Sequence, residues 1–315
     1  MYNALLIGCG NIGAMYDWDN DHILTHAKAY FKSGKVNSSF YDLNKEQVQM
    51  VANRYNGKVI DNLDFALKNS KFDIVSICTP TSTHFSLLSN VLKSKTSVII
   101  CEKPISINYN ELEQLREIYS NSASKVLVNY MRRYQPSYNQ LSNILANFPE
   151  NEVLTNISIR YQRGFINNCS HALDLLQFLF KKKFEPQNFI ITRREFDHFQ
   201  NDPTISGQGE WLNASLNILG LRNIRYSLFE IDLYFVNKKI QIINSGNEIN
   251  FFFVEDINSK YPILAIQNEM NMSDCIADYM MPVIEKTISL INNSDMDNFL
   301  EALQLNETIL NILNN

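Results

Sequence analysis

Apolar positions in residues 1–130 come in short uninterrupted runs, separated by stretches in which apolar and polar residues mix at helical spacing. Short continuous runs are typical of parallel strands that are covered on both faces. The predicted strands are residues 4–8, 36–41, 72–78, 97–101 and 125–129. The predicted helices between them are residues 45–55, 63–69, 83–93 and 110–120. Repeated strand–helix units of this kind predict a doubly wound parallel sheet with right-handed crossovers.

The pattern changes near Pro136, and from there on most runs are strand-like and lack long helices between them. Helices are predicted at residues 138–147 and 172–180, with a partly alternating run at residues 153–161. The later predicted strands are residues 188–192, 209–219, 223–236, 239–244 and 249–254, with a turn at Asn237. This succession predicts hairpins and an open, mostly antiparallel sheet in an α+β domain. Two helices, at residues 274–292 and 297–313, are expected to end it.

Composition and charge narrow the class of protein. The 315 residues suffice for two domains, and 45% hydrophobic with 19% charged residues suits ordinary buried cores. A net charge of −5 without a basic stripe disfavours a nucleic-acid partner. We find no run long enough to span a membrane and no apolar signal core, so a cytoplasmic protein without a membrane partner is expected. The five cysteines form no C-x-x-C pair, which favours small buried side chains over a metal site.

A glycine-rich loop follows the first predicted strand directly. Residues 8–13 read G-C-G-N-I-G, which fits the G-x-G-x-x-G pattern of a dinucleotide-binding turn. Gly8 permits the tight turn, Gly10 lets the backbone approach a pyrophosphate, and Gly13 lets helix and strand pack closely. The predicted phosphate-binding residues are Gly8, Gly10, Asn11, Ile12 and Gly13, at the start of a helical segment whose N–H groups face the phosphates. Residues 1–130 are therefore predicted to form a Rossmann domain, and residues 131–315 a substrate-binding and oligomerisation domain that includes the helices of residues 274–313.

Asp42 ends the second predicted strand, where a carboxylate accepts hydrogen bonds from the adenosine ribose. The same charge would repel a 2′-phosphate, which favours NAD over NADP. Asp42 lies farther from Gly13 than the usual spacing of about 20 residues, which fits an insertion at residues 16–24. The insertion opens like a calcium-binding loop, but His22 and Lys28 stand where that loop needs Gly and Glu, so we expect a solvated loop without calcium.

Lys103, within Glu102-Lys103-Pro104, closes the fourth predicted strand. Ligands of open α/β sheets bind beyond the carboxyl ends of the strands, so this lysine can reach a substrate hydroxyl or carbonyl oxygen. Burial would ease its deprotonation, because desolvation disfavours the charged form. The alternative is a structural lysine that is paired with a nearby acid.

These residues belong to an ordered set of motifs. The glycine loop is followed by Ile77-Cys78-Thr79-Pro80 with His84, by Glu102-Lys103-Pro104, by Arg132-Arg133-Tyr134-Gln135-Pro136 and by Ser170-His171-Ala172-Leu173-Asp174. The combination resembles the Gfo/Idh/MocA family, the glucose–fructose oxidoreductase and inositol dehydrogenase relatives. The resemblance extends over the first 180 residues, and beyond them only the β-rich pattern agrees. It implies an NAD(P)-dependent dehydrogenase that acts on a sugar, a sugar derivative, such as a sugar nucleotide, or a cyclitol.

The resemblance also implies roles for single residues. Lys103 would contact the reacting oxygen, the peptide before Pro104 would be cis, and His171 would act as general acid or base. Many members carry an aspartate four residues before that histidine, where this chain has Asn167. Asparagine can orient a substrate hydroxyl but cannot take a proton, so the proton relay of this chain departs from the family pattern. Asp174 lies one helical turn after His171 and either orients the imidazole or bonds to backbone.

The remaining candidates complete the predicted site. The residues expected to line the cofactor crevice are Thr79, Pro80, His84 and Glu102. The residues expected to hold a polyhydroxylated substrate are Lys103, Arg133, Tyr161, Arg163, Asn167 and His171. Two other classes of protein stay open: an imine or bilin reductase or an NAD-retaining epimerase or lyase on the same scaffold, and a cofactor-sensing protein without catalysis. Asn167 keeps the second open, whereas Lys103 together with His171 argues against it.

An assembly is predicted from one strand of the second domain. Phe229, Ile231, Leu233 and Phe235 alternate along it and share a face, and residues 251–253 add apolar surface. An open sheet must cover its apolar face, so we expect a homodimer or homotetramer that pairs these faces. The alternative is that the last two helices cover the face instead.

Overall fold

The computed structural model describes residues 1–256 and 258–314. The chain forms two compact units: residues 1–134 with residues 278–307, and residues 135–277 with the end of the chain from Thr308. The predicted domain boundary at residue 130 is thus close to residue 134, where the chain first passes from one unit to the other. The predicted assignment of the C-terminal helices is wrong, because α8 (Met280–Asn292) and the first half of α9 (Phe299–Asn314) belong to the first unit.

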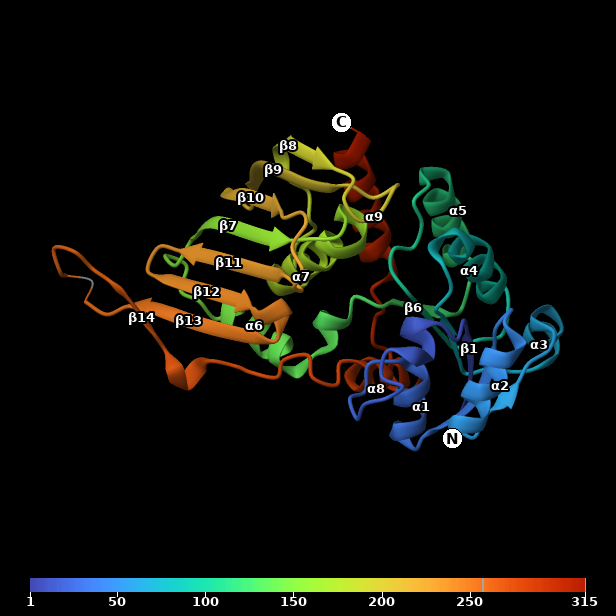
Figure 1. Ribbon diagram of the computed structural model, residues 1–315. Coiled ribbons are helices and arrows are strands. Elements are labelled where there is room, and N and C mark those ends of the chain that lie inside the picture. Colours follow the sequence, from blue (N-terminus) through green and yellow to red (C-terminus); the bar gives the residue numbers. More distant parts are fainter. Residues whose placement is uncertain (257, 315) are drawn as a thin grey trace. The chain divides into compact units, whose positions relative to one another are not determined.

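The first unit contains a parallel sheet of six strands, in the order β3-β2-β1-β4-β5-β6 (Figure 1). The strands are β1 (Tyr2–Ile7), β2 (Val36–Tyr41), β3 (Lys58–Val59), β4 (Ile74–Ile77), β5 (Val98–Cys101) and β6 (Lys125–Val128). Every residue of β4 and β5 is buried, as expected of strands covered on both faces. This order confirms the predicted doubly wound fold, and it brings the carboxyl ends of β1, β4 and β5 to one edge.

The helices of this sheet begin at polar caps. Asn44, Asn62 and Asn108 accept hydrogen bonds from the first backbone N–H groups of α2 (Lys45–Arg54), α3 (Leu63–Asn69) and α5 (Tyr109–Ser120). The remaining helical elements are α1 (His26–Ser33), α4 (His84–Leu92) and the short turns at Asn11–Met15, Thr81–Thr83 and Met131–Tyr134. Sequence periodicity missed α1, which is only eight residues long and packs in one core with α8.

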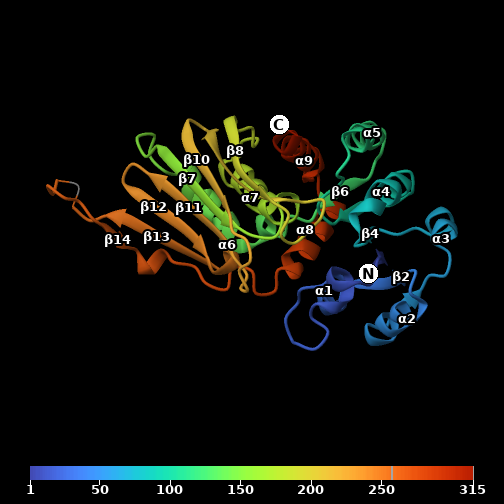
Figure 2. The ribbon, with the colours of Figure 1, turned by 45° about the horizontal axis from the view of Figure 1, so that its top comes forward.

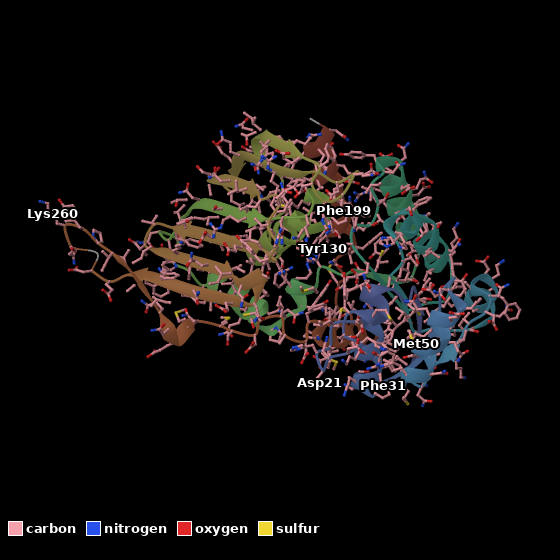
Figure 3. The ribbon with its side chains drawn as sticks, viewed as in Figure 1. Asp21, Phe31, Met50, Tyr130, Phe199 and Lys260 are labelled. Atoms are coloured by element: carbon pink, nitrogen blue, oxygen red, sulfur yellow. The ribbon has the colours of Figure 1, made fainter. Side chains whose placement is uncertain are left out.

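The second unit contains a mostly antiparallel sheet in the order β14-β13-β12-β11-β7-β10-β9-β8, in which β7 and β10 are parallel. Its strands are β7 (Leu154–Tyr161), β8 (Gln187–Glu195), β9 (Thr204–Trp211), β10 (Ala214–Gly220), β11 (Phe229–Phe235), β12 (Lys238–Ile243), β13 (Glu248–Val254) and β14 (Leu264–Ile266). The predicted single strand at residues 209–219 covers the end of β9 and most of β10. Leu212 and Asn213, both with positive φ, form the turn between these two strands. Lys260 lies at the far end of the β13–β14 hairpin (Figure 3).

Two helices of the second unit, α6 (Pro136–Ala146) and α7 (Ser170–Phe180), lie on one face of this sheet (Figure 2). Phe148, just after α6, packs edge-on against Phe235, with 5.1 Å between the ring centroids. Phe180 of α7 packs edge-on against Trp211, with 5.7 Å between the ring centroids. The apolar face of β11, from Phe229 to Phe235, is therefore buried inside the unit. A homo-oligomer was expected because this face would otherwise be uncovered, and that argument is wrong, since the face is covered within the chain. The oligomeric state itself stays a prediction. Across the described residues, no helix combines the length and apolar character that crossing a membrane requires.

Candidate functional site

The glycine loop after β1 has the backbone that a dinucleotide requires. Gly8 has φ of +95°, and a Cβ there would lie 2.7 Å from the carbonyl oxygen of Cys78. A Cβ on Gly13 would lie 2.1 Å from the carbonyl oxygen of Gly8, so neither position accepts a side chain without movement. A Cβ on Gly10 would meet no atom within 4 Å. Two glycines thus serve the turn and its packing, while the third leaves the backbone open to a ligand, which fits a diphosphate.

The helical segment that opens at this loop is only five residues long. Residues Asn11–Met15 form a single π-helical turn, in which the N–H groups of Ala14 and Met15 both donate to the carbonyl oxygen of Gly10. The chain then leaves the helical path and re-enters it only at His26, the start of α1. The phosphates would therefore meet a loop and one turn, which carries a smaller dipole than a long helix would.

Asp42 lies beside the glycine loop. Its Oδ2 accepts a hydrogen bond from the backbone N–H of Cys9 at 2.7 Å, and its Oδ1 accepts one from Asn44 at 2.8 Å. The half-buried carboxylate thus ties the end of β2 to the loop that follows β1. Each carboxylate oxygen can accept a further bond, so ribose binding by Asp42 is compatible with this position and stays a prediction.

The inserted segment at residues 16–24 is anchored from within. Asp17 is fully buried and accepts hydrogen bonds from the N–H of Leu24 at 2.7 Å and from the N–H and hydroxyl of Thr25, both at 2.9 Å. Lys28 donates from Nζ to the carbonyl oxygen of Asp17 at 2.9 Å. The expectation of a solvated loop holds for outer residues such as Asp21, labelled in Figure 3, but is wrong for Asp17.

His84 joins the two loops that follow β4 and β5. It is buried, with Nδ1 2.8 Å from the carbonyl oxygen of Pro104 and Nε2 2.8 Å from that of Thr79. Both ring nitrogens are thus engaged by backbone, which corrects the expectation that His84 lines the cofactor crevice. Thr79 is half-buried and Pro80 exposed at the start of the crossover. The Lys103–Pro104 peptide is cis, as the resemblance implied.

A buried polar cluster surrounds Glu102, the residue that precedes Lys103. Glu102 Oε1 is 3.0 Å from His26 Nε2 and accepts a hydrogen bond from Asn129 Nδ2 at 2.6 Å. His26 Nδ1 is 3.0 Å from the hydroxyl of Ser76, which is 2.6 Å from the hydroxyl of Tyr30. Glu102 therefore turns one oxygen inward, although the sequence placed it among the cofactor-binding residues.

The pKa of Glu102 results from opposing effects. Burial pushes the pKa upward, but hydrogen bonds and charge from His26, the hydrogen bond from Asn129 and the charge of Lys103 together hold it below its usual value. Glu102 is thus an ionised carboxylate at neutral pH. Sequence reasoning missed His26 and Asn129, because neither lies in a glycine, proline or charge pattern that predicts a partner.

In the second unit, His171 is the second residue of α7 and follows a π-helical turn at Phe165–Cys169. Asp202 anchors this turn: Oδ1 accepts from the N–H of Ile166 and Oδ2 from that of Asn167, both at 2.8 Å. A Cβ on Gly164, which has φ of +84°, would lie 2.1 Å from Asp202 Oδ2. The segment before His171 is therefore fixed by a carboxylate that sequence reasoning missed, in the Asp-Pro pair before β9. Whether Asp174 orients the imidazole stays open.

Two residues predicted to bind substrate have partners within the protein. Tyr161 is fully buried, and its hydroxyl donates to the carbonyl oxygen of Ile205 at 2.9 Å and accepts from its N–H at 2.7 Å. Tyr161 is therefore a core residue of the sheet, which corrects the prediction. Arg133 is buried and pairs with Glu301 at 3.0 Å, which gives it a structural partner instead of a free guanidinium. Arg163 is exposed and has φ of +63°, a backbone conformation that is uncommon outside glycine, and its binding of substrate stays a prediction.

The predicted residues thus divide between the units. The first unit holds the glycine loop, Asp42 and Lys103, and the second holds Asn167 and His171. The meeting of lysine and histidine at one substrate stays a prediction. Where the chain is described, no three His, Cys, Asp or Glu side chains gather as a metal site would require.

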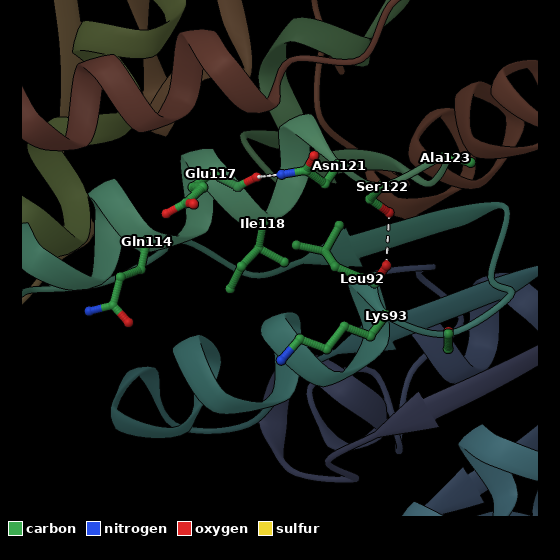
Figure 4. A pocket seen from close by; sticks show the side chains of 9 residues that line it. Leu92, Lys93, Gln114, Glu117, Ile118, Asn121, Ser122 and Ala123 are labelled. Atoms are coloured by element: carbon green, nitrogen blue, oxygen red, sulfur yellow. Dashed lines mark hydrogen bonds between the residues drawn. The ribbon is translucent and has the colours of Figure 1, made fainter.

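A groove between α4 and α5 contains none of the predicted site residues (Figure 4). Two of its polar side chains are bonded within the unit: Asn121 donates to the carbonyl oxygen of Glu117 at 2.9 Å, and Ser122 donates to that of Leu92 at 2.8 Å.

Comparison with known proteins agrees with this geometry. Residues 2–130 match the Gfo/Idh/MocA oxidoreductase family in its NAD-binding Rossmann fold. The inositol 2-dehydrogenase of Rhizobium meliloti is 29% identical over 136 residues, which are 42% of this chain and 37% of that protein. The chain spans less than half the length of the curated relatives it matches.

Solved structures extend the likeness in fold to both units. The UDP-N-acetylglucosamine 3-dehydrogenase of Acidithiobacillus ferrooxidans superposes with a TM-score of 0.78 at 15% identity, covering 98% of this chain and 96% of that one. A dehydrogenase from Chromobacterium violaceum superposes with a TM-score of 0.77 at 14% identity, covering 99% and 94%. At these identities the likeness establishes the shared fold.

Proposed function

From the match of residues 2–130 to the NAD-binding Rossmann fold of the Gfo/Idh/MocA oxidoreductases, we propose that this chain is a dehydrogenase of secondary alcohols. The substrate would be a sugar, a sugar derivative such as a sugar nucleotide, or a cyclitol. The observation that carries the proposal is a glycine loop open at Gly10, on the same sheet edge as Lys103 at the end of β5.

The chain's own residues have distinct tasks in this reaction. The backbone around Gly10 would bind the diphosphate and Asp42 the ribose, and the bound nicotinamide supplies the hydride acceptor or donor. Lys103 would donate a hydrogen bond from Nζ to the substrate oxygen. His171 would take the hydroxyl proton on an imidazole nitrogen, a task that suits a group titrating near neutrality. Asn167 would orient the substrate without exchanging a proton.

Cofactor and substrate class have separate support. The carboxylate of Asp42 beside the glycine loop favours NAD over NADP, because it would repel a 2′-phosphate. The names of two relatives, an inositol dehydrogenase and a UDP-N-acetylglucosamine dehydrogenase, support a polyhydroxylated ring as substrate. We infer no metal and no nucleic-acid partner in this activity.

A spectrophotometric panel tests the proposal. Sugars, inositols and sugar nucleotides are each incubated with NAD or NADP, and the absorbance of the reduced cofactor is followed. Lys103→Ala and His171→Ala are expected to lower kcat/KM by roughly 10³-fold or more while NAD affinity by calorimetry stays nearly unchanged. Lys93→Ala, at an exposed lysine, is the matched control and keeps wild-type turnover.

Two outcomes would overturn parts of the proposal. Wild-type rates in both Lys103→Ala and His171→Ala would refute the catalytic assignment. Tight NAD binding without turnover of any compound in the panel would instead favour a cofactor-binding protein.

A further inference from the structure

We propose that His26 is a positioning residue: it holds Glu102 as a carboxylate behind Lys103, so that Lys103 serves the reaction as a cationic hydrogen-bond donor and not as its base. The inference rests on the proposed function, because it assigns Lys103 one of two chemical roles in that reaction. It also changes the interpretation of the sequence, in which burial was expected to ease deprotonation of this lysine.

The direction of the hydrogen bonds favours this arrangement. His26 Nε2 carries a hydrogen to donate to Glu102 in the charged ring, and also in the neutral ring whose Nδ1 accepts from Ser76 while Ser76 accepts from Tyr30. The side-chain amide of Asn129 donates to the same oxygen. All five side chains are buried, so water does not compete for these bonds. Two N–H donors on one buried oxygen stabilise an ionised carboxylate.

Two of the titratable groups around Glu102, His26 and Lys103, lower its pKa by their charge. The groups whose titration is coupled to Glu102 are His26 of α1, Lys103 after β5, Cys78 after β4, Cys101 of β5 and Tyr279 before α8. Burial, reinforced by the charge of Glu102, raises the pKa of both thiols and of the Tyr279 phenol, so these groups stay neutral.

Coupling between two charges is reciprocal. Lys103 lowers the pKa of Glu102, so Glu102 must favour the ammonium form of Lys103 by the same interaction free energy. An ammonium has three donors and no acceptor, so it can bind a substrate oxygen or a developing alkoxide but cannot take the hydroxyl proton. Proton removal is then left to His171.

Chemical labelling tests the protonation of Lys103 without any turnover. Trace acetylation with acetic anhydride is measured from pH 6 to 11, and mass spectrometry quantifies the peptide that carries Lys103. In Glu102→Gln the half-labelling point is expected to fall by about one pH unit, which is about tenfold more labelling near neutrality. In His26→Gln the shift is smaller and in the same direction.

Three controls keep the test decisive. His22→Gln, at an exposed histidine of the same unit, retains the wild-type labelling curve. Circular dichroism establishes that each variant is folded, and Glu102→Gln, which preserves shape, decides the matter if His26→Gln does not fold. A labelling curve that is the same in Glu102→Gln as in the wild type would overturn the proposal.

The pH dependence of turnover supplies the second readout. A merely structural role predicts a loss of kcat that is equal at every pH, whereas the positioning role predicts that the alkaline limb of the profile moves to lower pH in both variants. Labelling shifts without wild-type turnover would refute the proposed function and leave the coupling of Glu102 with Lys103 intact. Turnover with no labelling shift would refute the positioning role and leave the function intact.

Discussion

Glu102 in the first unit and Asp232 in the second are both buried carboxylates with lowered pKa, yet their surroundings differ. Asp232 accepts from Arg160 Nη2 at 2.7 Å, Lys239 Nζ at 3.1 Å and Gln241 Nε2 at 2.7 Å. Glu102 is held from within by His26 and an amide, and its lysine neighbour stands at the end of a strand.

The two sites differ in how the cationic side chains around each carboxylate are paired. Arg160 also pairs with Glu230 at 2.7 Å, and Lys239 lies 5.0 Å from the ring of Tyr234, so the network around Asp232 is closed on itself. Such a network fixes the pairing of β7, β11 and β12 and leaves no charge for a ligand. Around Glu102 the hydrogen-bond donors are His26 and Asn129 of the core, and Lys103 acts on it through its charge. The same type of group thus ties strands together in one unit, and in the other it lies next to the proposed catalytic lysine.

The largest expected effect is the loss of the closed network. Asp232→Ala leaves Arg160 and Lys239 without their shared buried partner, and we expect the free energy of unfolding to fall by about 2–4 kcal/mol. Urea unfolding followed by circular dichroism measures the change. NAD binding by the remaining folded protein should be unchanged, and a loss of NAD affinity would contradict the division between the two carboxylates.

A smaller effect is expected from acid. For Asp232, burial raises the pKa, but hydrogen bonds from Gln241, Lys239 and Arg160 outweigh it and hold the pKa below the ordinary 3.8. Its stabilisation is therefore complete above the unfolded pKa and is lost as the pH falls through the folded value, at no more than about 1.4 kcal/mol per pH unit.

The comparison of wild type with Asp232→Asn makes this dependence measurable. The difference in unfolding free energy should be constant between pH 6 and 8 and should narrow below about pH 4. Asp61→Asn, at an exposed aspartate, should show no such narrowing. A difference that grows on acidification would have the wrong sign and would contradict the assignment.

The smallest expected effect concerns the turn before His171. Asp202→Ala removes the acceptor of two backbone N–H groups. We expect the free energy of unfolding to fall by about 1–2 kcal/mol and kcat to fall several-fold. Glu150→Ala, at an exposed position of the same unit, serves as the control. Unchanged stability and turnover in Asp202→Ala would show that the turn does not need its carboxylate.

Local patterns located much of the candidate site. Strand periodicity and the glycine spacing placed Gly8, Asp42 and Lys103 at strand ends, because these features depend on neighbours a few residues away. The same reasoning failed for Tyr161, since alternation along β7 does not say which of its residues meets the backbone of β9. It also failed for α1, which is short and stands apart from the glycine loop behind an inserted segment.

The amino-acid sequence by itself determined the parallel sheet, the open glycine loop and the order of the motifs, because short-range periodicity and turn chemistry specify them. Only the tertiary structure decided that His26, Ser76 and Asn129 gather around Glu102, and that α8 completes the first unit from the far end of the chain. Such partners lie on separate elements, and their hydrogen bonds exist only once packing has excluded water and brought those elements together.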